Sequence, residues 1–415
     1  MSNNTNEIEE RAKSYIAKIE GHGSLEIDWE KGGVKLHVHE GERLFEGILV
    51  GRTVEEMHWI TPRICGVCPI AHNLASLKAV EGALGVEISD DTAFLRRLMQ
   101  IGQNVQSHIL HAVFLALPDY IGLDRATELN KKDPKKFEMA LSLKELGDEI
   151  AYVIAGRNVH PTTTTVGGFH RVPDADELRD LLEKIKKNIP YAEKMAELFA
   201  GLDYPNLNVD LELLAIDIGI VISNKRESFK ISEYKKNIEE EVKEYSTAKF
   251  GTYNGGSFMV GALARLKHET FYKKDYSAYG IDFKNPFHNN LAQMVEVLFE
   301  LESAQLIIEN FLKNGINETV AKISKNPPLF GIGSVEAPRG GLYNEVHIKP
   351  SGKEIKNYIV TEANIITPTV QNLSSMESSA EALLKTHSGK SKKELEHLLE
   401  MLIRAYDPCI TCSVH

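Results

Sequence analysis

Cysteine is scarce in this sequence, with only four in 415 residues. A secreted scaffold held together by disulfides would carry more cysteines in a shorter chain, so that class of protein is excluded. The four cysteines form two C-x-x-C pairs at opposite ends of the chain, Cys65 with Cys68 and Cys409 with Cys412. Such pairs in an intracellular protein usually indicate metal binding or redox chemistry.

Long apolar runs are also absent. One of the longest, over residues 211–223, is interrupted by Glu212 and Asp217, whereas a helix that spans a bilayer needs about 18 apolar residues. The first residues lack the cationic segment and apolar core of a secretory signal. We therefore expect a cytoplasmic protein with no direct insertion into the membrane.

Basic residues are outnumbered, because 48 lysines and arginines face 59 aspartates and glutamates, a formal net charge of −11. Binding to nucleic acid needs a clustered basic surface, so we expect no nucleic-acid partner. The run over residues 235–244 mixes both signs, which is typical of a solvated helix face. The remaining composition is that of an ordinary globular protein.

The spacing of apolar residues predicts a mainly α protein with a small β portion, an α+β fold. Alternation predicts a β-hairpin from residues 24–29 and 34–39 around Gly32-Gly33. Further strands are predicted at residues 48–50, 342–348 and 355–366. Spacings of three and four predict helices at residues 70–84, 92–117, 174–188, 191–202, 233–246, 287–312, 375–385 and 390–404.

The sequence has no internal repeat and no low-complexity linker, so we expect one compact unit over residues 1–415. Within it we expect a flexible tail over residues 1–14 and a β-rich segment over residues 15–52. A mainly helical body would follow over residues 53–415 and contain the second cysteine pair near its end.

A predicted helix follows directly on the first cysteine pair. Pro69 begins it, so Cys68 would lie near a helix N-terminus, where the dipole favours a thiolate. Four sulfurs suit zinc, nickel or an iron–sulfur cluster better than magnesium or calcium. Spacing alone favours a structural zinc held by four thiolates. A single iron–sulfur cluster and a thioredoxin-like dithiol are less common alternatives.

The residues around both pairs narrow these alternatives. R-x-C-G-x-C-x-x-x-H over residues 63–72 and D-P-C-x-x-C-x-x-H over residues 407–415 resemble the first and last metal-binding motifs of [NiFe] hydrogenase large subunits. Four shorter blocks resemble the same family: K-I-E-G-H at 18–22, F-E with G-R at 45–52, G-I-G-S-V-E-A-P-R-G at 331–340 and I-I-T-P-T at 365–369. The related subunit of complex I lacks the nickel cysteines, and [FeFe] hydrogenases use unrelated motifs.

The resemblance implies a central bundle of long helices with an N-terminal β-hairpin, and a nickel–iron centre whose iron carries CO and two cyanides. All four thiolates would bind nickel, and Cys68 and Cys412 would also bridge to iron. His72 would hydrogen-bond a bridging sulfur. The small pocket around the iron ligands would be formed by Ala337, Pro338, Arg339, Thr367, Pro368 and Thr369.

The implied reaction is the reversible heterolytic cleavage of H2, that is, H2 oxidation and proton reduction. The terminal thiolate Cys409 would accept the proton first, and Glu20 would receive it next. Arg339 and Asp119 would polarise H2 from the opposite face, and Asp407 would pair with Arg339. In an unrelated sequence these side chains would more often be surface or structural groups.

The resemblance also implies a magnesium ion, or another divalent cation, near the end of the sequence. Its ligands would be Glu46, the carbonyl of Ile365 and His415. Histidine is an unusual ligand for magnesium, so this site rests on the resemblance alone. The family's maturation protease cuts after the position of His415, so we expect the mature form, or a gene without the extension. Nickel and iron chaperones would act during assembly.

The four cysteines would all be used by the metal centre, which leaves no iron–sulfur cluster in this chain. An iron–sulfur small subunit is therefore implied, with further flavin or iron–sulfur subunits that carry electrons to NAD(P), a deazaflavin or a heterodisulfide reductase. The stretches at residues 117–120 and 156–161 favour the NAD(P)-linked and sulfhydrogenase-like branch. The alternatives are a membrane-bound energy-converting hydrogenase and a non-catalytic subunit that holds zinc.

Overall fold

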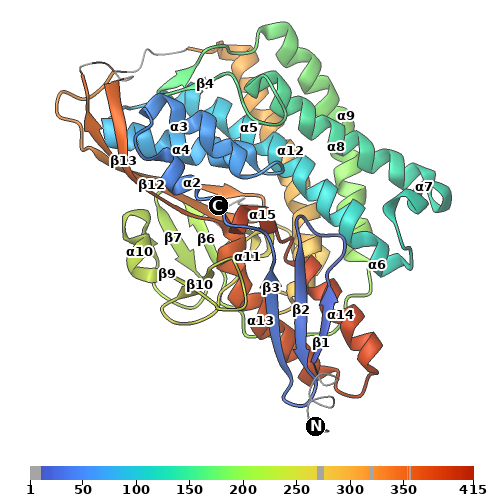
Figure 1. The fold of residues 1–415 in the computed structure, drawn as a ribbon. Helices are drawn as coiled ribbons and strands as arrows, with labels where there is room; N and C mark the ends of the chain where they lie inside the picture. Colours follow the sequence, from blue (N-terminus) through green and yellow to red (C-terminus); the bar gives the residue numbers. More distant parts are fainter. Residues whose placement is uncertain (1–10, 269–274, 318–321, 353, 355–356) are drawn as a thin grey trace.

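The structure, a computed structural model, describes residues 11–268, 275–317, 322–352, 354 and 357–415. Four long helices form its largest part: α5 (Asp90–Ile109), α8 (Pro134–Ala155), α9 (Ala175–Ala200) and α12 (Asn289–Asn314) (Figure 1). Helix α5 packs on α8 and α12, and α9 packs on α8 and α12. The predicted fold class, mainly helical with a small β portion, is confirmed.

Two glycines allow α5 and α8 to touch backbone to backbone. A Cβ on Gly102 would lie 2.6 Å from the nitrogen of Ala151, and one on Gly147 would lie 2.6 Å from the nitrogen of Gln106. Both distances are shorter than a Cβ can tolerate, so only glycine fits this crossing. Helix α5 then continues through a π-helical segment, Leu110–Ala116, into α6 (Leu117–Ile121).

A second layer consists of α4 (Pro69–Leu84) on an antiparallel sheet with the order β11-β12-β13. These strands span Phe330–Ala337, Gly340–Pro350 and Tyr358–Ile366. Gly331 and Gly333 of β11 lie against the backbone of α4, where a Cβ would come within 2.0 Å of a carbonyl oxygen. The close approach fixes the helix that follows the first cysteine pair on the hairpin that carries Arg339.

A third layer contains the N-terminal sheet, in which β1 (Arg11–Tyr15), β2 (Gly23–Asp28) and β3 (Gly33–Val38) pair antiparallel. It leans on α13 (Pro368–Thr386), which also packs on α14 (Lys392–Ala405) (Figure 1). The shorter helices are α2 (Phe45–Leu49), α3 (Val54–Ile60), α7 (Leu129–Lys132), α10 (Tyr234–Asn237), α11 (Ala262–Lys267) and α15 (Ile410–Ser413). The shorter strands are β4 (Thr164–Thr165), β5 (Gly168–Phe169), β6 (Leu214–Asp217), β7 (Ile220–Ser223), β8 (Phe229–Lys230), β9 (Ile238–Glu241) and β10 (Phe250–Tyr253).

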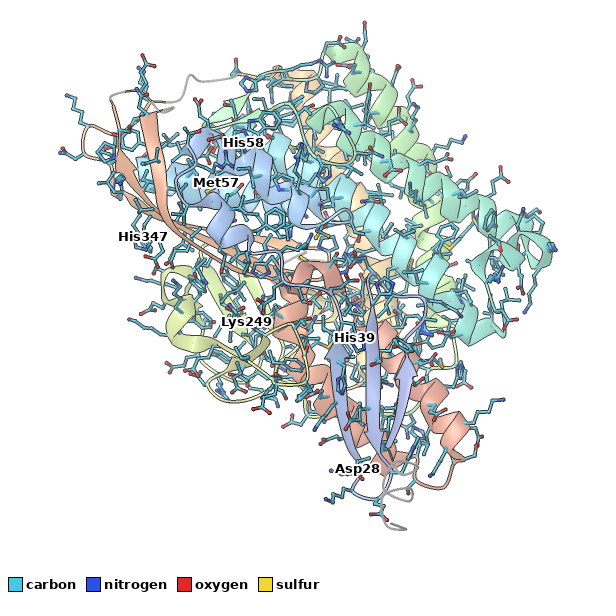
Figure 2. All side chains as sticks on the ribbon, in the orientation of Figure 1. Asp28, His39, Met57, His58, Lys249 and His347 are labelled. Carbon is cyan, nitrogen blue, oxygen red and sulfur yellow. The ribbon has the colours of Figure 1, made fainter. Side chains whose placement is uncertain are left out.

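Side chains fill the space between these layers (Figure 2). Met57 and His58 of α3, for example, are fully or almost fully buried at 0% and 2% exposure. Among the described residues, no helix combines the length and the apolar character that crossing a bilayer requires.

Several element predictions were wrong for identifiable reasons. The break expected between residues 188 and 191 does not occur, because α9 runs through Pro190. Buried residues on both sides of this proline form one continuous apolar stripe, which outweighs the backbone hydrogen bond that the proline removes. Residues 48–50 end a helix rather than forming a strand, since only Leu49 of the three is buried. The helix expected over residues 233–246 is α10 followed by β9, which pairs with β10.

The N-terminal tail is shorter than expected. Residues 11–14 belong to β1, which pairs with β2 through backbone hydrogen bonds and so needs no strongly apolar sequence. The rest of the expected tail, residues 1–10, lies outside the described residues. Helix α8 and strand β11 were not predicted, although the other strands of that sheet were.

Candidate metal centre

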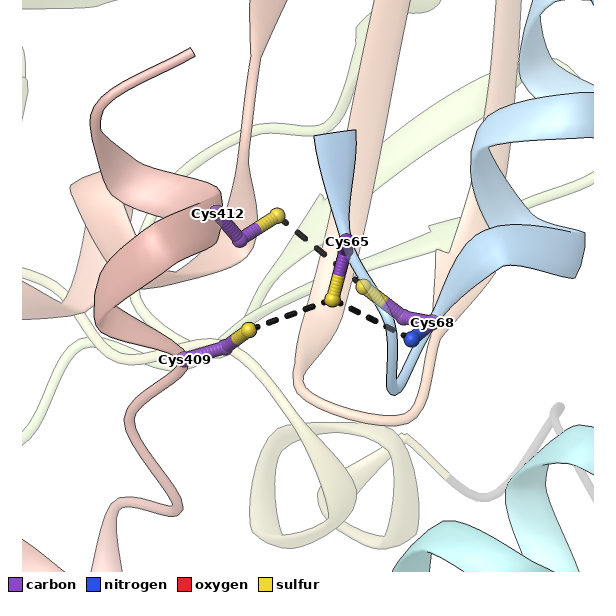
Figure 3. Close-up of side chains that lie close together, drawn as sticks. All are labelled: Cys65, Cys68, Cys409 and Cys412. Atoms are coloured by element: carbon purple, nitrogen blue, oxygen red, sulfur yellow. Dashed lines mark hydrogen bonds between the residues drawn. The ribbon is translucent and has the colours of Figure 1, made fainter. Parts of the chain in front are cut away.

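The two cysteine pairs come from distant parts of the chain and meet in the buried interior of the protein, where their four side chains lie close together (Figure 3). All four sulfur ligand atoms lie within 4.8 Å of one another. The Sγ atoms of Cys65 and Cys409 are 3.2 Å apart, and those of Cys68 and Cys412 are 3.9 Å apart. None is more than 4% exposed. The arrangement is a compact, buried cage of four soft ligands.

The first pair lies in a tight turn that ends at α4. The backbone N–H groups of Val67 and Cys68 donate to Cys65 Sγ at 3.3 and 3.2 Å, which favours a thiolate there. Gln103 of α5 caps the start of α4, since its Oε1 accepts from the N–H groups of Ile70 and Ala71. A side chain of the long bundle thus sets the position of the first pair.

The second pair is held by the segment around Glu20. The N–H of Ile410 donates to the carbonyl of Glu20 at 3.0 Å, and the N–H and hydroxyl of Thr411 both donate to its carboxylate. Gly21 has a φ of +82°, and a Cβ there would lie 2.7 Å from Ile410 Cβ. Both the conformation and the space require glycine, so the E-G-H block can approach the second pair closely.

Glu20 lies directly beside Cys409. Burial raises the pKa of its carboxyl to about 7, and the charge of the neighbouring thiolate adds to the effect. A carboxyl with this pKa exchanges protons readily near neutral pH.

Arg339 faces the cage from the tip of the β11–β12 hairpin and is almost completely buried. Its Nε donates to the carbonyl of Asp407 and its Nη2 to the carboxylate of Asp407, both at 2.7 Å, while Nη1 donates to Ser107 Oγ at 3.2 Å. Burial opposes the charge, but Asp407 and the thiolates raise the pKa of Arg339 above its ordinary value. A permanent positive charge therefore lies next to four sulfurs.

His72 is completely buried, and its Nε2 lies 3.2 Å from Cys412 Sγ. Burial lowers the pKa of His72 to about 3, so the ring is neutral and can carry its proton on Nε2. Thr369 accepts from the N–H of Cys409 at 3.0 Å. Among the described residues, the buried hydroxyl of Thr367 has no hydrogen-bond partner, as expected of a group that awaits a ligand.

Asp119 is placed differently from the other expected catalytic groups. Its carboxylate is held by Lys18 at 2.8 Å and by Arg404 at 2.9 Å. Neither partner is a cage residue, so these contacts point to a structural ion pair. Lys18 makes a single-point contact with this carboxylate, which an ammonium group can supply.

The three residues expected around a divalent cation lie close together in space, next to the C-terminal residue His415. His415 Nε2 lies 2.7 Å from the carbonyl oxygen of Ile365, and Glu46 Oε1 accepts from the N–H of the same residue at 2.7 Å. Carboxylate, carbonyl and imidazole groups thus share one small region beside the second cysteine pair. The carboxylate and carbonyl oxygens are the donors that a cation such as magnesium prefers, and the imidazole is the less usual third donor.

Other residues of the site gave no signal in the sequence. Arg43 donates to the carbonyls of Ile64 and Thr411, and so ties the two cysteine loops together. Gln293 donates to Asp407 at 2.9 Å and is 2.7 Å from Nδ1 of His111. These residues lie in no motif, and their partners are far away in sequence.

Comparison with known proteins supports this description. The sequence model of the family described as nickel-dependent hydrogenase matches residues 43–147 and 223–415. The alpha chain of sulfhydrogenase 1 from Pyrococcus furiosus is 35% identical, covering 97% of this chain and 96% of that protein. The corresponding chain of the F420-non-reducing hydrogenase from Methanothermobacter marburgensis is 32% identical, covering 96% and 93%.

Solved structures share the fold. An NAD+-reducing [NiFe]-hydrogenase in the H2-reduced state superposes with a TM-score of 0.84 at 24% identity, covering 98% of this chain and 99% of that chain. A [NiFeSe]-hydrogenase of Dm. baculatum superposes with a TM-score of 0.75 at 22% identity, covering 98% and 100%. At these identities the likeness establishes the architecture.

Proposed function

Because this chain belongs to the nickel-dependent hydrogenase family, we propose that its four-cysteine cage holds a nickel–iron centre and cleaves H2 heterolytically. The observation that carries the proposal is the set of ionisable side chains next to the cage. A carboxyl whose pKa is about 7 and a buried guanidinium flank the four sulfurs. A structural zinc site needs neither group, so these neighbours favour catalysis over the non-catalytic alternative.

The residues present fit such a centre. Four buried sulfurs provide soft ligands for nickel, and His72 can donate a hydrogen bond to Cys412. Arg339 and the free hydroxyl of Thr367 provide donors for the CO and cyanide ligands that we propose on iron. When bound, the centre supplies the redox and Lewis-acid chemistry that polarises H2.

The chain itself handles the proton. Cys409 accepts it at Sγ, and Glu20 takes it over at its carboxylate, which the N–H and hydroxyl of Thr411 hold in place. Arg339 holds its positive charge against the cage without titrating, because its fork is fixed by Asp407 and Ser107. Asp407 balances that charge in a buried region.

We propose that a small subunit with iron–sulfur clusters docks where the cage is nearest to the surface. Gly66 lies between the first two cysteines and is exposed, as is Arg63. The charges of Arg63 and Arg157 both lower the pKa of His160, although burial is the main cause, so two positive charges lie near this histidine. This face is therefore complementary to a negatively charged surface on the partner subunit.

Charge reversal at this face tests the docking. Arg157→Glu is expected to weaken retention of the small subunit by about tenfold or more, because like charges then face each other. Exchange between H2 and solvent protons, measured with the small subunit in saturating excess, is expected to persist. The control is Arg179→Glu, which changes another exposed arginine, on α9. Equal retention by both variants would place the interface elsewhere.

The divalent cation is proposed to bind between Glu46, the carbonyl of Ile365 and His415. Glu46→Gln removes the negative charge and is expected to abolish magnesium retention while nickel and iron remain. The thermal midpoint of the variant should no longer rise when Mg2+ is added. Metal analysis checks the first result and calorimetry the second, with exposed Glu42→Gln as the control. Magnesium at the wild-type level in Glu46→Gln would contradict the site.

We further propose that electrons pass through the small subunit, and through flavin or iron–sulfur subunits, to an acceptor such as NAD(P), a deazaflavin or a heterodisulfide reductase. The name of one relative, a sulfhydrogenase subunit, supports the sulfhydrogenase-like branch. The name of another, an F420-non-reducing hydrogenase subunit, gives no support to a deazaflavin acceptor. A cytoplasmic location, the action of a maturation protease and metal chaperones, and the energy-converting alternative stay predictions. Identification of the co-purified subunits would distinguish a complex with a soluble electron acceptor from the energy-converting alternative.

A further inference from the structure

Arg265 is a fully buried arginine in the part of the chain that carries no recognisable motif. It lies on α11, is 1% exposed, and uses all five of its N–H donors. Two go to the carboxylate of Glu296 at 2.6 and 2.7 Å, and one goes to the carboxylate of Glu336 at 2.7 Å. The other two go to backbone carbonyls, those of Ala337 at 2.9 Å and Pro338 at 3.0 Å.

The two carbonyls belong to the residues directly before Arg339. Ala337 pairs with Gly340 at the end of the β11–β12 ladder, so Pro338 and Arg339 form the turn at the tip of this hairpin. The carbonyl of Pro338 lies in the turn itself, outside the ladder, where such groups usually face solvent, and that of Ala337 belongs to the last residue of the ladder. Here the guanidinium of Arg265 binds both carbonyls. It therefore fixes the orientation of the two peptide groups that precede Arg339.

A second contact fixes the same turn. Gly261 precedes α11 and has a φ of +116°, and a Cβ there would lie 3.1 Å from the carbonyl oxygen of Arg339. The start of α11 therefore lies directly under the turn, and Arg265 follows one helical turn later. Helix α11, the hairpin tip and α12, which carries Glu296, form one connected unit.

The charge of Arg265 is compensated locally. Burial opposes ionisation of Glu296, but Arg265 and His108 lower the pKa of its carboxyl to about 2. His108 Nε2 lies 3.0 Å from that carboxylate. The planar guanidinium of Arg265, bound through two N–H groups to an ionised carboxylate, is held in one orientation. An ammonium group on a lysine side chain could adopt several orientations.

We propose that Arg265 is a positioning residue that sets the direction in which the Arg339 guanidinium faces the metal cage. It touches none of the four cysteines in the described contacts, and it acts through the turn that it holds. The inference rests on the proposed function, because that function gives Arg339 its role beside the metal centre.

The chain offers a matched control for this role. Arg96 is also buried, at 4% exposure, and also binds one glutamate with a fork, Glu81 at 2.6 and 2.7 Å. It also donates to one backbone carbonyl, that of Thr165. Its partners lie away from the Arg339 turn, so Arg96→Lys carries a similar structural cost without the positioning effect.

The experiment compares Arg265→Lys and Arg96→Lys in the mature enzyme with its small subunit. Lysine keeps the charge but cannot reproduce the five-donor fork. We expect both variants to lose thermal stability. Only Arg265→Lys should displace the infrared bands of the cyanide ligands and slow exchange between H2 and solvent protons, by roughly 10- to 100-fold.

Wild-type bands and exchange in Arg265→Lys, at the wild-type nickel content, would overturn the inference. So would equal displacement of the bands in Arg96→Lys. If Arg265→Lys fails to mature, Glu336→Gln replaces it, because this substitution weakens the contact that holds Arg265 from the side of the hairpin. We expect it to move the cyanide bands in the same direction, by a smaller amount. Unchanged bands in Glu336→Gln would overturn the inference. Absence of CO and cyanide bands in the unmutated enzyme would instead overturn the proposed function, and this inference with it.

Discussion

Replacing Cys412 by serine is expected to abolish both nickel retention and H2 uptake. Serine offers a hard oxygen with a much higher pKa in place of a soft thiolate, and nickel in a sulfur cage loses a quarter of its ligands. Cys412 also receives the contact from His72, so the variant loses that support as well. Metal analysis and an H2-uptake assay measure the two effects on the same sample.

The outcome separates the two interpretations of the cage. Loss of nickel together with all activity is the result that the proposed centre requires. Retention of nickel and of more than a tenth of the activity would contradict the assignment of Cys412 as a ligand. Zinc in place of nickel in the unmutated protein, lost on the same substitution, would favour the structural alternative.

Glu20→Gln is expected to lower H2 oxidation by roughly 100- to 10,000-fold, the range in which general acid–base catalysis contributes. Glutamine keeps the size of the side chain and an oxygen that can accept from Thr411, but it cannot carry a proton at neutral pH. Nickel content and the infrared bands should stay those of the unmutated enzyme. Turnover with a viologen dye and exchange between H2 and deuterated water measure the loss.

A matched control is Glu40→Gln. Glu40 lies on the same end of the N-terminal sheet, where it binds His22 at the surface and does not contact the cage in the described contacts. Its substitution should leave turnover close to the unmutated rate. Equal losses in both variants, or full activity in Glu20→Gln, would remove Glu20 from the proton route.

The local chemistry of the site was predictable because it depends on residues that are close together in the sequence. Pro69 and the apolar spacing after it predicted α4, and the C-x-x-C spacing predicted paired thiolates near its start. The presence of two C-x-x-C pairs already favoured one metal held by all four thiolates, although spacing could not identify that metal. Nickel and iron came from the resemblance of the flanking residues, and the structure brings the four sulfurs together.

The supporting residues could not be predicted for the same physical reason. Gln103 accepts from Ile70, which lies 33 positions earlier, and Arg265 binds carbonyls 72 and 73 positions later. Each is an ordinary helix residue in sequence, and its role depends on packing between elements. Pro190 shows the converse, since a strong local signal to end a helix was overridden by the burial of α9 along its length.

The charges around the cage explain why so many buried ionisable groups are present. Arg339 is balanced by Asp407, and Arg265 is balanced by Glu296. Arg265 also binds Glu336, although burial raises the pKa of that carboxyl to about 7. Burial of an ion pair costs desolvation, and such pairs are often replaceable by apolar residues without loss of stability. Two buried arginines in succession behind one sulfur cage are therefore better explained by their effect on the site than by stability.

The infrared spectrum of the purified complex, in the region where metal-bound CO and cyanide absorb, tests the central claim most directly. The account predicts one CO band and two cyanide bands from a sample that also contains nickel and takes up H2. A nickel-containing, fully matured sample without these bands, or a sample with zinc in the cage and no H2 uptake, would contradict it.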